Sequence, residues 1–138
     1  MSRFIAHNVQ VRNHELDSFG HVNHAVYLTY LEDARWTVLE VWGYPLQELK
    51  SRGWSIVATE ARLVFRAPAY GRDFLEVRTW FGEVARVRSE WKQQIVRPRD
   101  QRVILDALII GAFLDQRGRP MRIPEDLRTW FMRYVDRE

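Results

Sequence analysis

The spacing of hydrophobic residues changes along the chain, and each change marks the end of one predicted element. Over residues 4–12 apolar and polar side chains alternate loosely, which is typical of a β-strand. From residue 24 onward apolar side chains recur at helical spacing, which predicts a long amphipathic helix that stops at Gly43 and Pro45. The predicted apolar stripe of this helix comprises Tyr27, Tyr30, Leu31, Ala34, Val38, Val41 and Trp42.

The second half of the chain has the two-residue period of strands. A short helix over residues 46–52 precedes it and ends at Gly53. Strands are predicted over residues 55–65, 73–81, 87–96 and 103–114, with turns at 82–85, 98–101 and 116–120. The last of these strands is almost continuously apolar, as expected in the middle of a sheet. Pro124, followed by two acidic residues, predicts the start of a terminal helix.

This order of elements predicts an α+β fold in a single domain over residues 1–138. It places one strand first, then the long helix, then four strands in a meander and a terminal helix. One amphipathic helix covers one face of an antiparallel sheet, and the other face still carries apolar side chains. We therefore expect a second copy of the chain to cover that face, in a homodimer or a homotetramer.

Composition narrows the chemistry and the partners. The chain has no cysteine, which excludes disulfides, thiolate metal sites and a cysteine nucleophile. Its net charge is only +3 and its basic residues are interleaved with acidic ones, so we expect no nucleic-acid partner. No segment has the apolar length of a membrane span or the pattern of a signal peptide, which favours a soluble, cytoplasmic protein with no membrane partner.

Polar side chains crowd the break between the first strand and the long helix. Within residues 14–24 lie three histidines and two acidic residues. Gly20 fits a left-handed or close-approach position in this turn, and Asn23 fits the helix N-cap. Asp17 precedes a helix whose first backbone N–H groups are unpaired and lie at the positive end of the helix dipole. Such a carboxylate can attack a carbonyl or activate a water molecule while those N–H groups hold the developing oxyanion.

Alternative interpretations remain for each of these residues. Asp17 can instead hold its own turn through local hydrogen bonds. The histidines could bind a metal, but their spacing spans a turn, no zinc motif is present, and we predict neither a metal nor a cofactor. Tyr27 fits core packing as well as a substrate pocket. Three residues near the start of one strand either meet substrate phosphates or form a solvated strand face: Arg86, Arg88 and Ser89.

The same stretch resembles the signature of hotdog-fold thioesterases of the 4-hydroxybenzoyl-CoA thioesterase type. The matching residues are Glu15-Leu16-Asp17-Ser18-Phe19-Gly20-His21-Val22-Asn23-His24, followed by Ala25-Val26-Tyr27. Further segments are similar to that family and to its acyl-ACP thioesterase branch, which includes plant methylketone synthase 2: Phe65-Arg66-Ala67-Pro68, Gly71-Arg72-Asp73-Phe74-Leu75-Glu76-Val77 and Arg119-Pro120-Met121-Arg122-Ile123-Pro124. The resemblance covers nearly the whole chain.

The resemblance implies a hotdog fold, in which an antiparallel sheet of about five strands wraps around one long central helix. It also implies paired sites at a dimer interface. The family's catalytic carboxylate falls on Asp17, its oxyanion donor falls on the backbone N–H of His24, and Gly20 lets the loop approach the thioester. This chain has Glu15 where the family more often has Asp, and His24 where it has a second Asn.

The leading hypothesis is therefore hydrolysis of acyl-CoA or acyl-ACP thioesters without a cofactor. Asp17 acts as nucleophile or general base, and Asn23, Tyr27, Arg86, Arg88 and Ser89 are the predicted substrate-binding residues. The first alternative is a non-catalytic module that binds acyl thioesters on the same fold. A hydratase or dehydratase of this fold is a further alternative, but such enzymes place a histidine and an acid on different segments.

Overall fold

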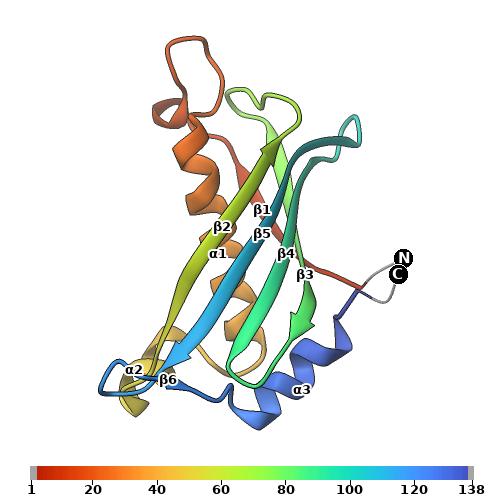
Figure 1. The fold of residues 1–138 in the computed structure, drawn as a ribbon. Helices are drawn as coiled ribbons and strands as arrows, with labels where there is room; N and C mark the ends of the chain where they lie inside the picture. Colours follow the sequence, from red (N-terminus) through yellow and green to blue (C-terminus); the bar gives the residue numbers. More distant parts are fainter. Residues whose placement is uncertain (1–2, 137–138) are drawn as a thin grey trace.

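A computed structural model describes residues 3–136, which form one antiparallel sheet and three α-helices (Figure 1). Residues 1–2 and 137–138 of the predicted single domain lie outside the described residues. The helices are α1 (His24–Val41), α2 (Leu46–Arg52) and α3 (Glu125–Arg133), and a short 3-10 helix, η1, spans Asn13–Glu15. The strands are β1 (Ile5–Gln10), β2 (Ser55–Phe65), β3 (Phe74–Val84), β4 (Arg88–Arg97), β5 (Arg102–Leu114) and β6 (Pro120–Met121). The α+β class is thus confirmed.

The sheet is not the four-stranded meander that the strand order suggested. Its order is β1-β3-β4-β5-β2, so only β3, β4 and β5 follow one another as a meander. β2 pairs with β5 at one edge, and β1 inserts beside β3 at the other. Strand periodicity gives the faces of a strand but not its neighbour, and for that reason the expectation failed.

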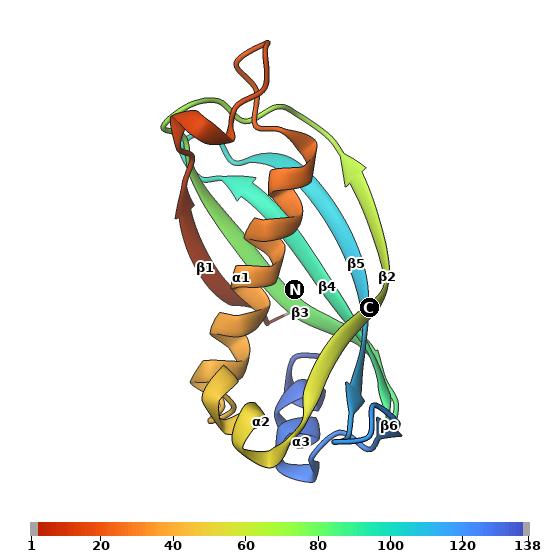
Figure 2. The ribbon, with the colours of Figure 1, turned by 90° about the vertical axis from the view of Figure 1, so that its left-hand side faces the viewer.

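The long helix α1 begins where Asn23 caps it, because the Asn23 side chain accepts a hydrogen bond from Ala25 N at 2.9 Å. α1 packs against β1 and β3 on one face of the sheet (Figure 2). Most of the predicted stripe is buried, but Val41 is 66% exposed, and Leu39 is buried in the core instead. Val41 is the last residue of the helix, and the next residue, Trp42, is buried against Phe81 of β3.

At the other end of the sheet, an aromatic cluster joins the helix ends to the strands. Trp42 stacks on Phe81 and Trp130, and Phe131 of α3 stacks on Phe81 with ring centroids 4.2 Å apart. The predicted turn at residues 82–85 is wrong, because β3 continues to Val84 and the chain turns at residues 85–87. The cluster closes the end of the molecule opposite the polar loop.

The edge strand β2 is poorly covered within the single chain. Its inner-face side chains are Ile56, Ala58, Ala61, Leu63 and Phe65, and a β-bulge lies between Ala58 and Glu60. α1 sits over β1 and β3 rather than over β2. As a result Phe65, on the inner face, is 51% exposed; on the outer face, Val64 is 45% exposed. A long apolar edge strand of this kind is normally covered by another chain or ligand.

Candidate active site

The polar loop before α1 is held in shape by Asp17. Asp17 Oδ1 accepts hydrogen bonds from Phe19 N at 2.8 Å and from His21 N at 3.1 Å. Gly20, between these two donors, has φ +79°, which confirms the predicted left-handed position. The local interpretation of Asp17 is thus correct for one carboxylate oxygen. Asp17 Oδ2 receives no hydrogen bond from residues 3–136.

The first turn of α1 presents a backbone donor next to this loop. Ala25 N donates to the Asn23 side chain, and Val26 N donates to Asn23 O at 2.9 Å. His24 N, which precedes them, has no acceptor among the described residues. An unpaired N–H at the positive end of a helix dipole is suited to an oxyanion.

Glu15 braces the loop against the helix, a role that the sequence analysis missed. Its Oε1 accepts hydrogen bonds from Tyr30 OH at 2.7 Å and from Arg12 N at 2.8 Å. Its backbone oxygen accepts from Asn23 N at 2.9 Å. Burial, followed by the hydrogen bond to Glu15, raises the pKa of Tyr30 above its ordinary value, so the phenol stays protonated and keeps donating. Glu15 therefore fixes the start of α1 relative to η1.

Asp17 and His24 line one open hollow of about 350 Å³ together with the end of β2 and the segment that follows it. The other lining residues are His21, Val22, Tyr27, Phe65, Arg66, Ala67 and Pro68. Tyr27 is buried, its hydroxyl accepts a hydrogen bond from Ala69 N at 3.2 Å, and burial raises its pKa. Tyr27 thus belongs to the core and also forms part of the hollow. The contribution of residues 65–68 was not foreseen.

A buried arginine holds the segment opposite the loop. Arg97 Nη1 donates to Pro68 O at 3.2 Å and to Asp73 Oδ2 at 3.1 Å, and its Nη2 donates to Asp100 at 3.0 Å. Hydrogen bonds to Asp100 and Asp73 raise the pKa of Arg97. Tyr70, in the same segment, packs edge-on against His21, with ring centroids 5.3 Å apart. Arg97, the last residue of β4, thus holds the segment that forms the wall of the hollow opposite the loop.

Replacing Arg97 with Met is expected to destabilise the fold by about 3 kcal/mol, because Asp73 would keep a buried charge without its main partner. Arg99→Met is the matched control: its guanidinium contacts the same carboxylate at 3.5 Å but is 67% exposed. We expect the control to cost less than about 1 kcal/mol. Urea unfolding measures both, and equal losses would contradict a structural role specific to Arg97.

The predicted phosphate-binding residues lie at the opposite end of the molecule. Arg86 and Arg88 are exposed at the β3–β4 turn, and Arg88 lies 3.9 Å from each of two carboxylates, Glu83 and Glu90. Ser89 is buried, and its hydroxyl accepts a hydrogen bond from Trp91 Nε1 at 3.0 Å. The structure thus gives Ser89 a packing role, and the predicted substrate contact would require it to leave that environment. None of the three reaches the hollow of its own chain.

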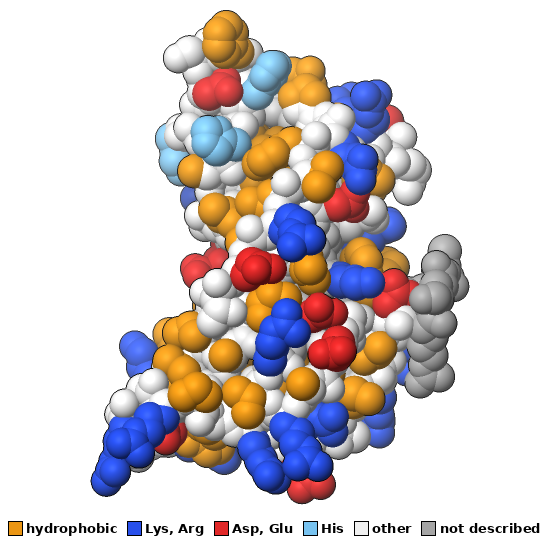
Figure 3. Space-filling view, viewed as in Figure 1, with side chains coloured by type: hydrophobic (Ala, Val, Ile, Leu, Met, Phe, Trp, Pro, Cys, Tyr) orange, Lys and Arg blue, Asp and Glu red, His pale blue; other side chains and the backbone are white. Residues whose placement is uncertain are grey.

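The histidines gather around the loop without forming a metal-ligand set. Figure 3 shows histidine side chains at the loop end of the molecule and a concentration of Lys and Arg at the other end. His21 packs on Tyr70 and His24 packs edge-on to Phe65. Within residues 3–136 no three His, Asp or Glu side chains come together as a metal site. The chemistry that the hollow offers is that of a carboxylate beside a helix N-terminus.

Comparison with known proteins identifies the family. The sequence matches the thioesterase-like superfamily over residues 11–131. It is 32% identical over 135 residues to the chloroplastic acyl-acyl carrier protein thioesterase ATL3 of Arabidopsis thaliana, a match that covers 98% of this chain and 71% of that protein. It is 30% identical over 107 residues to the long-chain acyl-CoA thioesterase FadM of Escherichia coli, covering 78% of this chain and 80% of that protein.

The fold agrees with this match. The structure of a 1,4-dihydroxy-2-naphthoyl-CoA thioesterase from Synechocystis superposes with a TM-score of 0.87 over 94% of this chain and 96% of that one. At 19% identity, that likeness speaks for the fold alone, which is the hotdog fold that the sequence motif implied. The chain therefore belongs to the thioesterase-like superfamily.

Proposed function

We propose that the protein hydrolyses acyl thioesters in the hollow that Asp17 and His24 line. Membership of the superfamily, together with similarity to relatives named as acyl-ACP and acyl-CoA thioesterases, makes the protein a thioesterase. The observation that carries the site assignment is the pairing of two free groups in one hollow. Within residues 3–136 one oxygen of Asp17 and the backbone N–H of His24 have no hydrogen-bond partner.

In this mechanism the thioester carbonyl oxygen accepts a hydrogen bond from His24 N–H. Asp17 then acts in one of two ways: Oδ2 attacks the carbonyl carbon, or it takes a proton from a water molecule that attacks. Either way the carbon–sulfur bond breaks, the thiol leaves and a free carboxylic acid forms. The free acid is produced directly in the general-base route and after hydrolysis of an anhydride in the nucleophilic route. Gly20 would let the thioester approach the loop backbone, and its positive φ favours glycine even though an added Cβ would have free space among residues 3–136.

The substrates that we propose are acyl groups carried by coenzyme A or by acyl carrier protein. ATL3 is named for the second carrier and FadM for the first, and the match leaves the choice open. Asn23 caps the helix beneath the carbonyl, and Tyr27 forms part of the wall. Arg86 and Arg88 would meet the carrier's phosphates only from a neighbouring protomer, because they lie at the far end of their own chain.

A dimer through β2 would bring that far end to the hollow. Antiparallel pairing of two β2 strands centred on Glu60 places Phe65 of one strand opposite Ser55 of the other. Within the chain, Ile56 pairs with Phe113, and the adjacent Ala112 pairs with Arg88, so Ser55 and Arg88 share one end of the sheet. The free edge of β2 would be paired in the same step.

This dimer predicts a particle of twice the chain mass of 16.5 kDa, or of four times that mass if the dimers pair further. Sedimentation equilibrium at micromolar concentration measures it. A fully active protein that sediments as a single chain would exclude a site that the second copy completes.

The activity itself is tested with a panel of acyl thioesters of different chain lengths, on coenzyme A and on acyl carrier protein, read by release of free thiol. Hydrolysis of at least one member is expected. Tight binding of acyl thioesters without thiol release would instead establish the non-catalytic module.

Within residues 3–136 no helix is long and apolar enough to cross a membrane. A cytoplasmic location stays a prediction.

A further inference from the structure

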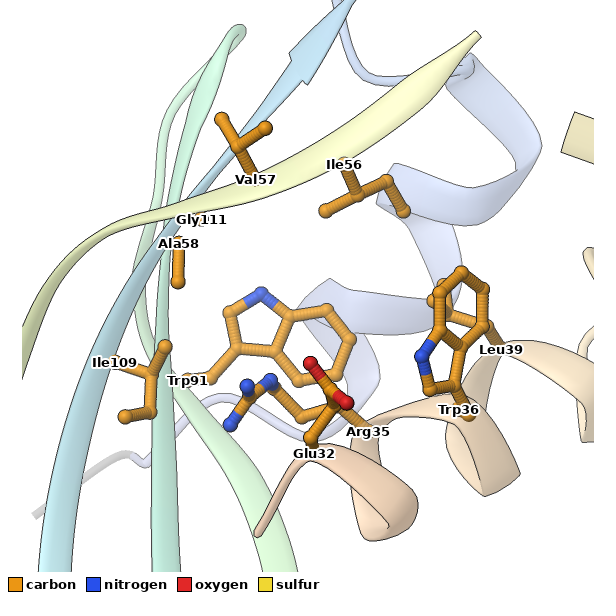
Figure 4. A pocket seen from close by; sticks show the side chains of 10 residues that line it. All are labelled: Glu32, Arg35, Trp36, Leu39, Ile56, Val57, Ala58, Trp91, Ile109 and Gly111. Atoms are coloured by element: carbon orange, nitrogen blue, oxygen red, sulfur yellow. The ribbon is translucent and has the colours of Figure 1, made fainter. Parts of the chain in front are cut away.

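A second, smaller cavity lies between α1 and the sheet, away from the Asp17 hollow (Figure 4). It has a volume of about 90 Å³. Its walls are mostly apolar and include Trp36, Leu39, Ile56, Trp91 and Ile109. Two charged side chains of α1, Glu32 and Arg35, point toward it. A cavity with this lining is suited to a ligand that is apolar over most of its length and polar at one end.

Arg35 is held in the cavity by a buried polar network. Its Nη1 donates a hydrogen bond to Gln93 Oε1 at 2.9 Å. Gln93 is 1% exposed, and its Nε2 donates to Leu31 O and to Thr79 Oγ1, both at 3.0 Å. Because both ends of the Gln93 amide are engaged, its orientation is fixed, and so is the guanidinium that it holds. The site is therefore rigid before any ligand arrives.

The guanidinium is left with unused donors. Arg35 has five N–H groups in a planar fork, and one of them is used by Gln93. No carboxylate of residues 3–136 lies within ion-pairing distance of it. Burial lowers the pKa of Arg35 from its ordinary value, which reflects the cost of a charge away from water, although the group stays protonated. A carboxylate is the group that matches such a fork best, since it accepts two parallel hydrogen bonds.

An apolar path leads from the cavity toward the catalytic hollow. The inner face of β2 carries Ile56 and Ala58 at the cavity and Phe65 at the hollow, with Ala61 and Leu63 between them. Ala58 and Ala61 are exposed, so the middle of the path is open within residues 3–136. Along α1 the two ends, His24 and Arg35, are about 17 Å apart. The tail of a fatty acid would cover this apolar surface.

We propose that the Arg35 cavity binds the carboxylate of a free fatty acid, with the acyl tail lying along the inner face of β2. The three non-hydrogen atoms of a carboxylate fit the volume, and Arg35 supplies the paired donors. A free fatty acid is also the class of product that thioester hydrolysis releases, so occupation of this path by the acid would compete with an acyl substrate. The site itself needs no turnover and is independent of the proposed chemistry at Asp17.

Glu32 is the one feature of the cavity that opposes an anion. It is exposed, so water screens its charge, whereas Arg35 is half-buried. We therefore expect Arg35 to prevail and Glu32 to weaken binding modestly. Removing the Glu32 charge should strengthen the binding of a carboxylate and leave a neutral ligand of the same length unaffected.

The test compares decanoate with decanol, which share a tail and differ in the head group. Binding is followed by calorimetry and by the fluorescence of Trp36 and Trp91, both in the cavity wall. The wild type should bind decanoate about tenfold or more tightly than decanol, the factor expected of a charge-assisted hydrogen-bonded pair. Arg35→Met should remove that preference while leaving the decanol affinity unchanged.

Arg62→Met is the matched control, because the Arg62 side chain is 71% exposed on the outer face of β2, and it should leave decanoate binding unchanged. If Arg35→Met does not fold, Glu32→Gln replaces it and should tighten decanoate binding alone. Equal wild-type affinity for the two ligands, or a carboxylate preference that survives Arg35→Met, would overturn the proposal. No thioester is present in this assay, so its outcome is separate from that of the hydrolysis test.

Discussion

Replacing Asp17 with Asn is expected to lower kcat by about 10²–10⁴-fold while leaving the fold intact. The amide oxygen of Asn can still accept the hydrogen bonds that Phe19 N and His21 N donate to Oδ1. The change therefore spares the structural half of the carboxylate and removes only the charge and basicity of the other oxygen. Free-thiol release under saturating acyl-CoA or acyl-ACP gives kcat, and circular dichroism and urea unfolding check the fold.

Asp115→Asn provides the matched control. Asp115 Oδ1 accepts hydrogen bonds from Arg117 N at 2.9 Å and from Arg119 N at 3.0 Å, two and four residues further on. Asp17 holds its loop with the same spacing, so the two substitutions make the same chemical change in the same local structure. Asp115→Asn should retain the parent rate. If Asp17→Asn hydrolyses the panel as fast as the parent, Asp17 is only a turn residue.

The sequence could predict most elements because each carries its own local signal. The bounds of α2 and β2 agree with those predicted. Gly53, in the left-handed conformation, ends α2, and β2 ends at Phe65, directly before Arg66-Ala67-Pro68. The position of β2 in the sheet could not be predicted in this way. It depends on which strand forms backbone hydrogen bonds with the second edge of β5, and side-chain periodicity does not reveal that choice.

The residues of the candidate site also differ in whether a local or a distant contact fixes them. Asp17, Gly20 and Asn23 lie within one short stretch, so their turn and cap chemistry is visible in the sequence. The contacts that support them come from far away in the chain: Tyr30 reaches back to Glu15, and Arg97 on β4 holds Pro68. Only the three-residue spacing of Arg12 and Glu15, whose carboxylate accepts a hydrogen bond from the Arg12 backbone N–H, could have indicated part of this support.

His24→Pro is the second change for which we expect a large effect, because proline removes the His24 N–H, which has no acceptor among the described residues. Loss of a single oxyanion donor costs about 10²–10³-fold in kcat. The helix should survive, since proline is favoured at the first helical position. Asn23 already has φ −59° and ψ 133°, the conformation that a residue before proline prefers.

His24→Ala separates the backbone group from the side chain. It keeps the N–H and removes the ring that packs edge-on to Phe65, so kcat should stay within a few-fold of the parent while KM rises if that ring shapes the pocket. The expected order of kcat is therefore parent, then Ala, then Pro far below. Two other orders of kcat would contradict the assignment of the oxyanion donor to the His24 N–H. A proline variant as active as the alanine variant would mean that the oxyanion finds its donor elsewhere, and an alanine variant as impaired as the proline variant would transfer the role to the imidazole.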